Sequence, residues 1–253
     1  MLDNIVVGKY YPKKSKIHTL SPLGKILSIV IFIIMCFFIN DYKTSISLAL
    51  LVFVVILNTK IPFKVYFKTI WSIKILLLFI ILITYFSSYS IEYTFVMTLK
   101  TILMVLYTNI LTLTTTKEDI ARGLEQFLFP LTLFYIRVNR IALSISLALR
   151  FIPSIIDEAN KILKSQASRG IDYNNSNFIG KFKALFAILI PLFRKSITKA
   201  DMLAEAMEVR LYNIDRKRTY IRENSFGFTD AYIVSIHVII LFLFILRRYS
   251  WDI

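Results

Sequence analysis

Five apolar runs constrain this chain more than any other feature of its sequence. They extend over residues 26–39, 46–57, 70–86, 93–115 and 229–246. A helix that crosses a bilayer needs roughly 20 mostly apolar residues, so the two shortest runs reach that length only with their flanks. Backbone groups inside a bilayer must be hydrogen-bonded within the protein, which predicts that each run is helical. The predicted fold class is therefore all-α, a polytopic membrane protein with about five transmembrane helices.

The composition agrees with this class and narrows the possible chemistry. Hydrophobic residues make up 57% of the 253 residues, and glycine and proline number only six each, which leaves little room for loops. The single cysteine, Cys36, lies in an apolar run, which excludes a disulfide framework and argues against a thiolate metal site. The only histidines, His18 and His237, lie at opposite ends of the chain. We expect no metal site, no cofactor and no catalytic residue.

The distribution of charge predicts the topology. The formal net charge is +15, and basic residues gather before the first run, between the second and third, and after the fourth. Because cytoplasmic loops of membrane proteins are rich in lysine and arginine, we expect a multi-pass protein of the cell (plasma) membrane with a cytoplasmic N-terminus. Attraction to anionic lipid in the bilayer explains the positive excess better than nucleic-acid binding does.

An odd number of spans leaves one conflict with the charge rule. Five spans place Arg247 and Arg248, which follow the last run, on the external side. A sixth span within residues 131–153 removes the conflict, but it puts Arg137 and Arg140 inside the bilayer at roughly 2.5–3.5 kcal/mol each. Five spans are the preferred interpretation, with the earlier loops fixing the topology.

The stretch between the fourth and fifth runs has a different composition. Residues 117–223 hold eleven of the sixteen acidic residues and eighteen lysines and arginines, and their apolar residues recur at helical spacing. We predict amphipathic cytoplasmic helices that lie against the membrane. The predicted division of the chain is therefore 1–115, 116–228 and 229–253: a basic segment with four transmembrane helices, a cytoplasmic helical block, and a last transmembrane helix. Two pairs in the block resemble helix-capping signals: Thr116 with Asp119, and Thr198 with Asp201.

Two stretches of this block end on a lone arginine in a similar setting. Residues 159–170 and 200–211 align on their arginines, and a proline precedes each. The residues at the two ends are Ser168, Arg169 and Gly170, and Val209, Arg210 and Leu211. Small residues let two helices approach closely, so we predict that these helices cross at Ala159, Ala200 and Ala204 and hold their arginine ends apart.

The arginines themselves have two interpretations. The helix dipole favours arginine in a last turn, with Gly170 following the cap, and this explains either arginine alone. It does not explain the repeat. The planar guanidinium suits bidentate pairing with a carboxylate in a desolvated interface. Two copies therefore imply two similar partners, or one partner with two similar sockets.

Several motifs are similar to one known family, the transmembrane T subunit of energy-coupling factor (ECF) ABC transporters, or CbiQ/EcfT family. The first is Ser15-Lys-Ile-His18-Thr-Leu20-Ser-Pro22-Leu-Gly-Lys25, which resembles S-x-x-H-x-L-x-P-x-x-K. The next runs from Thr114-Thr115-Thr116 to Phe129-Pro130-Leu131. Leu149-Arg150-Phe151-Ile152-Pro153 with Glu158-Ala159, and both arginine ends, complete the resemblance. The chain departs from the family at Leu211, where the family usually has glycine.

The resemblance implies a non-catalytic coupling subunit of an importer for a vitamin or a transition-metal ion. In this family the arginine motifs end two coupling helices, and each docks on one of two cytoplasmic ABC ATPase subunits. A separate S subunit captures the substrate. Residues 141–149 and 182–193 suit contact with the S subunit, but packing on the chain's own spans explains them equally well.

Two other functions fit the sequence less well. A membrane-embedded enzyme is disfavoured because the sequence contains no P-loop, HExxH motif or nucleophile elbow. A stand-alone membrane transporter or channel is disfavoured because the spans lack midplane charges and glycine-broken helices. Two polar residues of the fourth run have structural interpretations: Asn109 is expected to make an interhelical hydrogen bond, and Lys100 to reach the interface or face protein.

Overall fold

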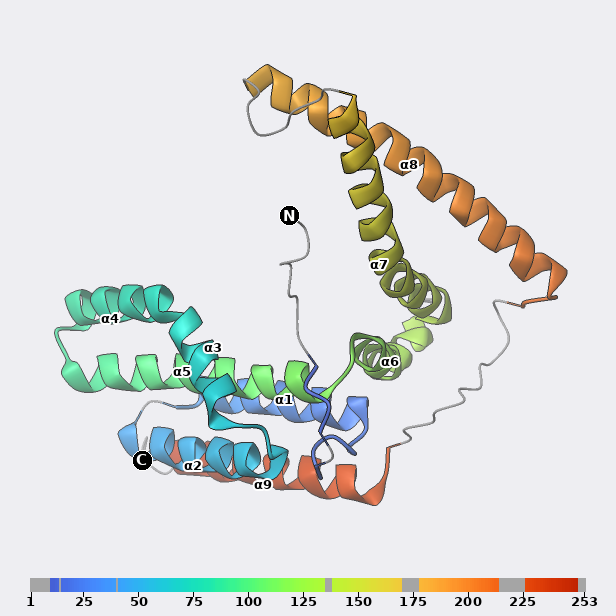
Figure 1. The fold of residues 1–253 in the computed structure, drawn as a ribbon. Helices are drawn as coiled ribbons and strands as arrows, with labels where there is room; N and C mark the ends of the chain where they lie inside the picture. Colours follow the sequence, from blue (N-terminus) through green and yellow to red (C-terminus); the bar gives the residue numbers. More distant parts are fainter. Residues whose placement is uncertain are drawn as a thin grey trace. The chain divides into compact units, whose positions relative to one another are not determined.

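The computed structural model describes residues 10–13, 15–39, 41–134, 138–169, 178–213 and 226–249. Within these ranges the chain forms nine α-helices, one 3₁₀ helix and no strand, which confirms the all-α fold class (Figure 1). It divides into two compact units. We name Val7–Phe134 with Tyr220–Ile253 the membrane unit, and Met1–Val6 with Tyr135–Thr219 the helix-pair unit.

The membrane unit contains the predicted apolar helices. Three of them are long and apolar enough to cross a bilayer: α2 (Tyr42–Thr59), α5 (Ile91–Thr114) and α9 (Phe228–Tyr249). In α9 the part that meets this test is Phe228–Arg247. The helix α1 (Pro22–Phe37) is apolar but has 16 residues, so it is about 24 Å long. A bent pair, α3 (Phe63–Ser72) and α4 (Lys74–Ser88), passes the same test when it is taken as one span. The polytopic class is thus confirmed.

The third run is not the single straight span predicted for residues 70–86. α3 and α4 meet at a break and differ in direction by 57°. Lys74 lies within the predicted run, and a charged side chain well inside a straight membrane helix is costly. The break makes Lys74 the first residue of α4, and its Nζ lies 4.6 Å from the centre of the Trp71 ring.

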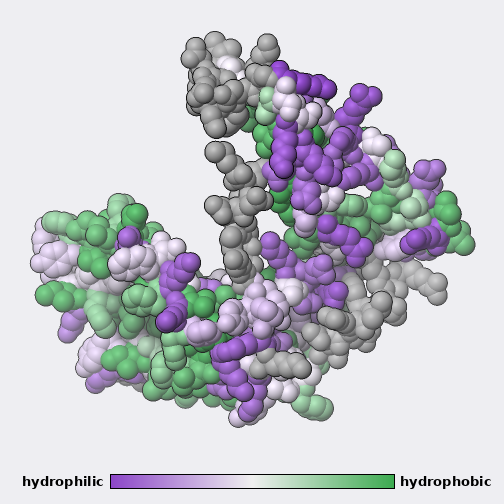
Figure 2. Space-filling view, in the orientation of Figure 1, coloured by the Kyte–Doolittle hydropathy of each residue, from purple (hydrophilic) through white to green (hydrophobic). Residues whose placement is uncertain are grey.

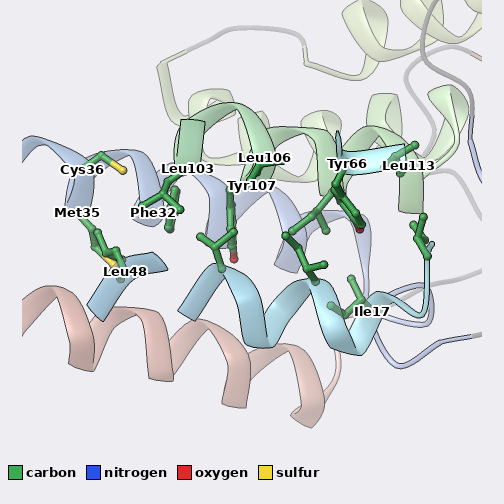
Figure 3. Close-up of a cluster of buried hydrophobic side chains, with 14 of the residues drawn as sticks. Ile17, Phe32, Met35, Cys36, Leu48, Tyr66, Leu103, Leu106, Tyr107 and Leu113 are labelled. Carbon is green, nitrogen blue, oxygen red and sulfur yellow. The ribbon is translucent and has the colours of Figure 1, made fainter. Parts of the chain in front are cut away.

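The core of the membrane unit is formed by α1, α2 and α5. Its completely buried side chains are Phe32, Met35, Cys36, Ile39 and Leu48. Phe32 stacks on Tyr107 of α5, with ring centres 4.1 Å apart. Figure 3 shows Phe32, Met35, Leu48 and Tyr107 within the buried cluster between the helices. Buried side chains that contact one another in this way resist displacement, so the cluster holds the three helices against one another.

The start of α1 is held by the last helix of the chain. Ser21 caps α1 by accepting a hydrogen bond from the Gly24 N–H at 3.0 Å, and Pro22 occupies the first helical position, where its missing N–H costs nothing. The Ser21 N–H in turn donates to Asp230 Oδ1 of α9 at 2.8 Å. A Cβ at Gly24 would lie 2.7 Å from that same oxygen, so this close approach requires glycine.

Two other residues of the N-terminal motif also have structural roles. Lys25 Nζ donates to the Thr114 carbonyl and to Thr115 Oγ1, each at 3.1 Å, and so joins α1 to the end of α5. His18 Nδ1 lies 2.7 Å from Ser15 Oγ, and its Nε2 lies 3.0 Å from the Tyr11 carbonyl. The motif therefore folds the N-terminal segment onto the start of α1.

The helix α6 (Lys117–Leu128) belongs to the membrane unit and is followed by the 3₁₀ helix η1 (Phe129–Phe134). Thr116 caps α6 by accepting from the Asp119 N–H at 3.2 Å, which confirms the first capping signal. The second signal was wrong, because Thr198 and Asp201 lie inside a continuous helix. The side of the membrane on which residues 116–228 lie stays a prediction.

The helix α4 packs on α5, yet none of its residues is buried. In Figure 2 hydrophobic residues dominate the face over α4 and α5, as expected of helices that face lipid. Asn109 of α5 donates to Thr69 Oγ1 of α3, which confirms the predicted interhelical hydrogen bond. Lys100 Nζ lies 5.6 Å from the centre of the Phe37 ring, so it faces protein as predicted.

Candidate functional site

The two arginine motifs end the two long helices of the helix-pair unit. These are α7 (Val138–Ser168) and α8 (Phe178–Val209), with 31 and 32 residues. Each contains a proline near its middle, Pro153 in α7 and Pro191 in α8. Proline removes one backbone hydrogen bond and bends a helix without necessarily ending it. Each amphipathic stretch is therefore continuous with the apolar stretch that precedes it.

Polar contacts hold α7 against α8. Lys199 Nζ donates to Ser154 Oγ at 2.8 Å, and Lys195 forms a salt bridge with Glu158. The hydrogen bond from Lys195 holds the pKa of Glu158 below its usual value, because it stabilises the charged carboxylate. The pairs 154 with 199 and 158 with 195 show that the two helices run antiparallel in this region, as Figure 1 also shows.

The predicted crossing at three alanines stays a prediction. Ala159 is half-buried, whereas Ala200 and Ala204 are exposed. The hydrogen bond between the helices joins Ser154 to Lys199, which is next to Ala200 in the chain. A small residue that is tightly covered on α8 is Ala184, with 1% of its surface exposed.

Arg169 follows the last residue of α7 and is exposed. Its N–H donates to the Gln166 carbonyl at 3.1 Å, and the Ser168 hydroxyl donates to the Lys164 carbonyl. Gly170 lies outside the described residues. The guanidinium is therefore presented at a hydrogen-bonded helix end, where the dipole favours a cation.

Arg210 is presented by a different local geometry. The Leu211 N–H donates to the Glu208 carbonyl and the Tyr212 N–H to the Met207 carbonyl, both at 2.9 Å. These two bonds form a Schellman motif, in which the residue after the cap adopts the left-handed conformation. That residue is Leu211, with φ of 54°. The turn that glycine usually makes is thus made here by leucine.

The tip at Arg210 exposes apolar side chains beside the cation. Val209 is 80% exposed and Leu211 is 90% exposed. A guanidinium between two exposed apolar residues combines the features that protein interfaces favour, since arginine and apolar groups can both be desolvated there. Leu211 therefore exposes an apolar side chain at the position where the family usually has glycine.

The two arginine ends lie far apart within the helix-pair unit. Arg169 lies at the α7 end that leads into α8, and Arg210 lies at the far end of α8. Glu158 pairs with Lys195, and from this pair Arg169 is 11 residues along α7 and Arg210 is 15 residues along α8 in the opposite direction. At about 1.5 Å per residue the two arginines are roughly 40 Å apart, so their guanidinium groups cannot share one small ligand. The geometry favours contact with two separate sites.

A row of exposed apolar residues runs along the first half of α8. It includes Phe182, Phe186, Ile190, Phe193 and Ile197, which are 47% to 69% exposed. Their spacing of three or four residues puts them on one face of the helix. On α7, Ile141, Ile145, Ile152 and Ile156 are also exposed, each by more than a third. Exposed apolar patches of this kind mark contact with a protein or a membrane.

Among the described residues no group of three or more His, Cys, Asp or Glu side chains could hold a metal ion. Sequence reasoning assigned no contacts to three polar residues that are buried in the membrane unit: Lys25, Asp230 and His237. Asp230 is visible in the sequence as a carboxylate at the start of the last apolar run. Its partner, the Ser21 backbone, is not, because 209 residues separate the two.

Comparisons with known proteins agree with these observations. A family model described as "Cobalt transport protein" (CbiQ) matches residues 13–221. The chain is 34% identical to the "Energy-coupling factor transporter transmembrane protein EcfT" of Bacillus subtilis (strain 168), over 98% of this chain and 100% of that protein. Proteins of the same name from Streptococcus equi subsp. equi (strain 4047) and Clostridium kluyveri are 32% and 33% identical, each over at least 98% of both chains.

Proposed function

Because the chain belongs to the CbiQ/EcfT family of membrane transport proteins, we propose that it is the coupling subunit of an ATP-driven importer. In this proposal α7 and α8 are coupling helices that lie in the cytoplasm with the N-terminus. Their arginine ends dock on two ABC ATPase subunits, and a separate S subunit delivers a vitamin or a transition-metal ion. The chain itself catalyses no reaction, and its partners hydrolyse ATP.

The observation that carries the proposal is the pair of exposed arginine ends on one antiparallel helix pair. Each end offers a guanidinium at a hydrogen-bonded helix terminus, and roughly 40 Å separates the two. Two similar docking elements at opposite ends fit two similar ATPase subunits. The docking residues are Ser168, Arg169 and Gly170 on one side, and Val209, Arg210 and Leu211 on the other.

The apolar row of α8 supports the second part of the proposal. Phe186, Ile190 and Phe193 are more than half exposed, yet they continue the same helix that carries Arg210. A protein seated on this row moves when the end of α8 moves, because a continuous helix transmits displacement along its axis. We assign this row to the S subunit.

Charge reversal at the arginines tests the ATPase part. We expect Arg169→Glu or Arg210→Glu to weaken co-purification of one ATPase subunit and to reduce uptake, and the double variant to abolish both. Removing one member of a buried, hydrogen-bonded charge pair at an interface typically weakens binding by about 2–5 kcal/mol. Arg169→Lys and Arg210→Lys are expected to impair docking as well, because an ammonium cannot replace a bidentate fork.

The matched control is Arg194→Glu, which reverses an exposed arginine in the middle of α8. We expect this variant to keep both ATPase subunits. Normal uptake with normal recovery of both ATPases in the Arg169→Glu, Arg210→Glu double variant would refute the docking role.

A further inference from the structure

A groove runs along the membrane unit between α2 and α9. The helix α1 packs on α9 and α2 packs on α5, whereas α2 and α9 scarcely contact each other. The space between them is a cavity of about 760 Å³, which lies within the range of ligand-binding sites. In Figure 3 the ribbons of α2 and α9 run beside each other next to the buried cluster.

The walls of this groove are apolar and open to the outside of the protein. On α2 they include Leu50 and Val54, and on α9 Ile236 and Leu243, and all four are exposed. At the depth of the spans, the outside is the hydrocarbon of the bilayer. From Thr229 to Phe244, both of which line the groove, α9 extends over about 22 Å. This exceeds the roughly 15 Å of hydrocarbon in one leaflet.

The floor of the groove is polar but needs no added partner. Tyr107 of α5 and His237 of α9 both line it. The Tyr107 hydroxyl lies 2.6 Å from His237 Nε2, and His237 Nδ1 lies 2.8 Å from the Ile233 carbonyl. Both ring nitrogens and the hydroxyl are therefore already paired. A dry, apolar occupant fits this floor better than a polar solute does.

One end of the groove is basic. Lys16 and Lys25 line it there, and Lys13 Nζ donates to the Lys60 carbonyl at the end of α2. Lys25 gives two of its three N–H donors to α5 and its C-cap residue, so one donor remains for a further acceptor.

Two carboxylates lie near this end, and both have partners. Asp230 accepts hydrogen bonds from the Ser21 and Gly227 backbone N–H groups. Asp119 accepts from the Thr116 hydroxyl and pairs with Arg122 at 3.7 Å. At the opposite end of α2 and α9, Arg247 lies 4.0 Å from Asp41. The groove is therefore positive at one end only.

We propose that this groove binds one anionic phospholipid of the surrounding bilayer. Its phosphate lies beside Lys16 and Lys25, and one acyl chain lies between α2 and α9. The basic end and the apolar walls match the charged headgroup and the apolar tail of such a lipid. The site uses no residue of α7 or α8 and does not depend on the docking of other subunits.

Quenching of tryptophan fluorescence by brominated lipids tests this site in the full chain. The background replaces both native tryptophans with phenylalanine (Trp71→Phe, Trp251→Phe). Ile236→Trp then puts a probe in the groove, and Phe79→Trp puts a matched probe on the exposed surface of α4. Vesicles contain phosphatidylcholine with increasing fractions of brominated phosphatidylglycerol.

We expect the groove probe to reach half-maximal quenching at a mole fraction of brominated phosphatidylglycerol about five-fold lower than the α4 probe requires. A lysine near a phosphate contributes about 1 kcal/mol, which corresponds to roughly this factor in affinity. Lys16→Gln is expected to move the groove curve onto the α4 curve and to leave the α4 curve unchanged. Native mass spectrometry is a second readout, and it needs no tryptophan in the groove. We expect the unmodified chain to retain phosphatidylglycerol and the Lys16→Gln variant to lose it.

Three results would overturn the proposal. Identical curves at both probes mean that the groove sees only bulk lipid. Equal quenching by brominated phosphatidylcholine means that the headgroup is not selected. Quenching at the α4 probe without quenching at the groove probe means that polypeptide fills the groove, either another segment of this chain or a second protein.

Discussion

At Leu211 a bulky side chain occupies a backbone conformation that normally belongs to glycine. Its φ is 54°, and two hydrogen bonds of 2.9 Å close the turn around it. For an L-residue with a Cβ, this conformation costs about 1–2 kcal/mol. Leu211 is 90% exposed, so contacts within the chain do little to offset that cost. The strain is consistent with a side chain kept for contact with a partner.

This conformation gives a prediction at a single residue. We expect Leu211→Gly to stabilise the end of α8 by about 1 kcal/mol, because glycine enters the left-handed region without steric cost. Leu211→Ile is expected to destabilise it, since β-branched residues tolerate that region poorly. Hydrogen exchange at the backbone amide of Tyr212 measures both effects. Faster exchange in Leu211→Gly than in the native chain would show that the turn is not strained.

His18 gives a second prediction, on pH. Burial lowers the pKa of His18, the charge of Lys25 acts in the same direction, and the hydrogen bond to Tyr11 opposes both. The unfolded chain therefore binds a proton more readily than the folded chain does. The contribution to stability is complete above the ordinary pKa of about 6.5 and is lost as the pH falls below it.

We expect the thermal unfolding temperature of the purified chain to fall between pH 7 and pH 5. His18→Asn is expected to be less stable at pH 7 and to show a smaller fall. The fall reflects the cost of holding a protonated imidazole in a partly buried site near Lys25, because burial and the Lys25 charge both disfavour the charged ring. An equal pH dependence in both chains would rule out His18 as its source.

At the scale of elements, Gly24 and Asp230 decide how closely α1 and α9 approach. We expect Gly24→Ala to destabilise the membrane unit by about 1–3 kcal/mol, because the added Cβ would lie 2.7 Å from an oxygen of a carboxylate held by two backbone N–H groups. The control is Gly227→Ala. Its added Cβ would lie 3.8 Å from Asp230 Oδ2, an ordinary contact distance, so we expect almost no change in stability.

Asp230→Ala in the Gly24→Ala background is expected to add less destabilisation than it does in the native chain, because the two positions share one contact. Chemical unfolding of the four chains measures this coupling. If the two changes in unfolding free energy simply add, Gly24→Ala does not destabilise the protein through contact with Asp230.

Sequence patterns predicted those elements whose causes are local. The apolar runs and the Thr116 cap depend on neighbours in the chain or on the bilayer. The sequence also predicted that Asn109 bonds to another helix, but not that its partner is Thr69, which is 40 residues away. The break at Ile73 depends on the cost of burying Lys74, which a hydropathy average conceals. The continuity of α7 and α8 through Pro153 and Pro191 depends on packing between the two helices. The contacts of Asp230 join distant residues and leave no local pattern.

At the scale of the whole molecule, the charge conflict at the last span has a structural answer. Arg247 lies 4.0 Å from Asp41, in the turn that follows α1. A cation paired with a carboxylate carries less weight in orienting a membrane protein than a free one, because the net charge at that end is smaller. Five spans with Arg247 outside are therefore compatible with the positive-inside rule.

The corresponding prediction is the orientation of the chain. Reporters inserted after Lys60 or within residues 174–177 are expected to be cytoplasmic, and a reporter at Ser88 is expected to be external. The basis is the distribution of lysines around the first four runs. An external signal from residues 174–177 would contradict the cytoplasmic position of α7 and α8, and the ATPase docking with it.

The bond between Ser21 and Asp230 also sets an order of events during biosynthesis. At about 5–20 residues per second, the ribosome reaches Asp230 roughly 10–40 s after Ser21. During that interval the first helix is in the bilayer without the last helix against which it packs. The membrane unit can close only after the whole of α7 and α8 has been made. A nascent chain that stops short of Phe228 therefore lacks the carboxylate that accepts from the Ser21 N–H, and the start of α1 stays without this contact.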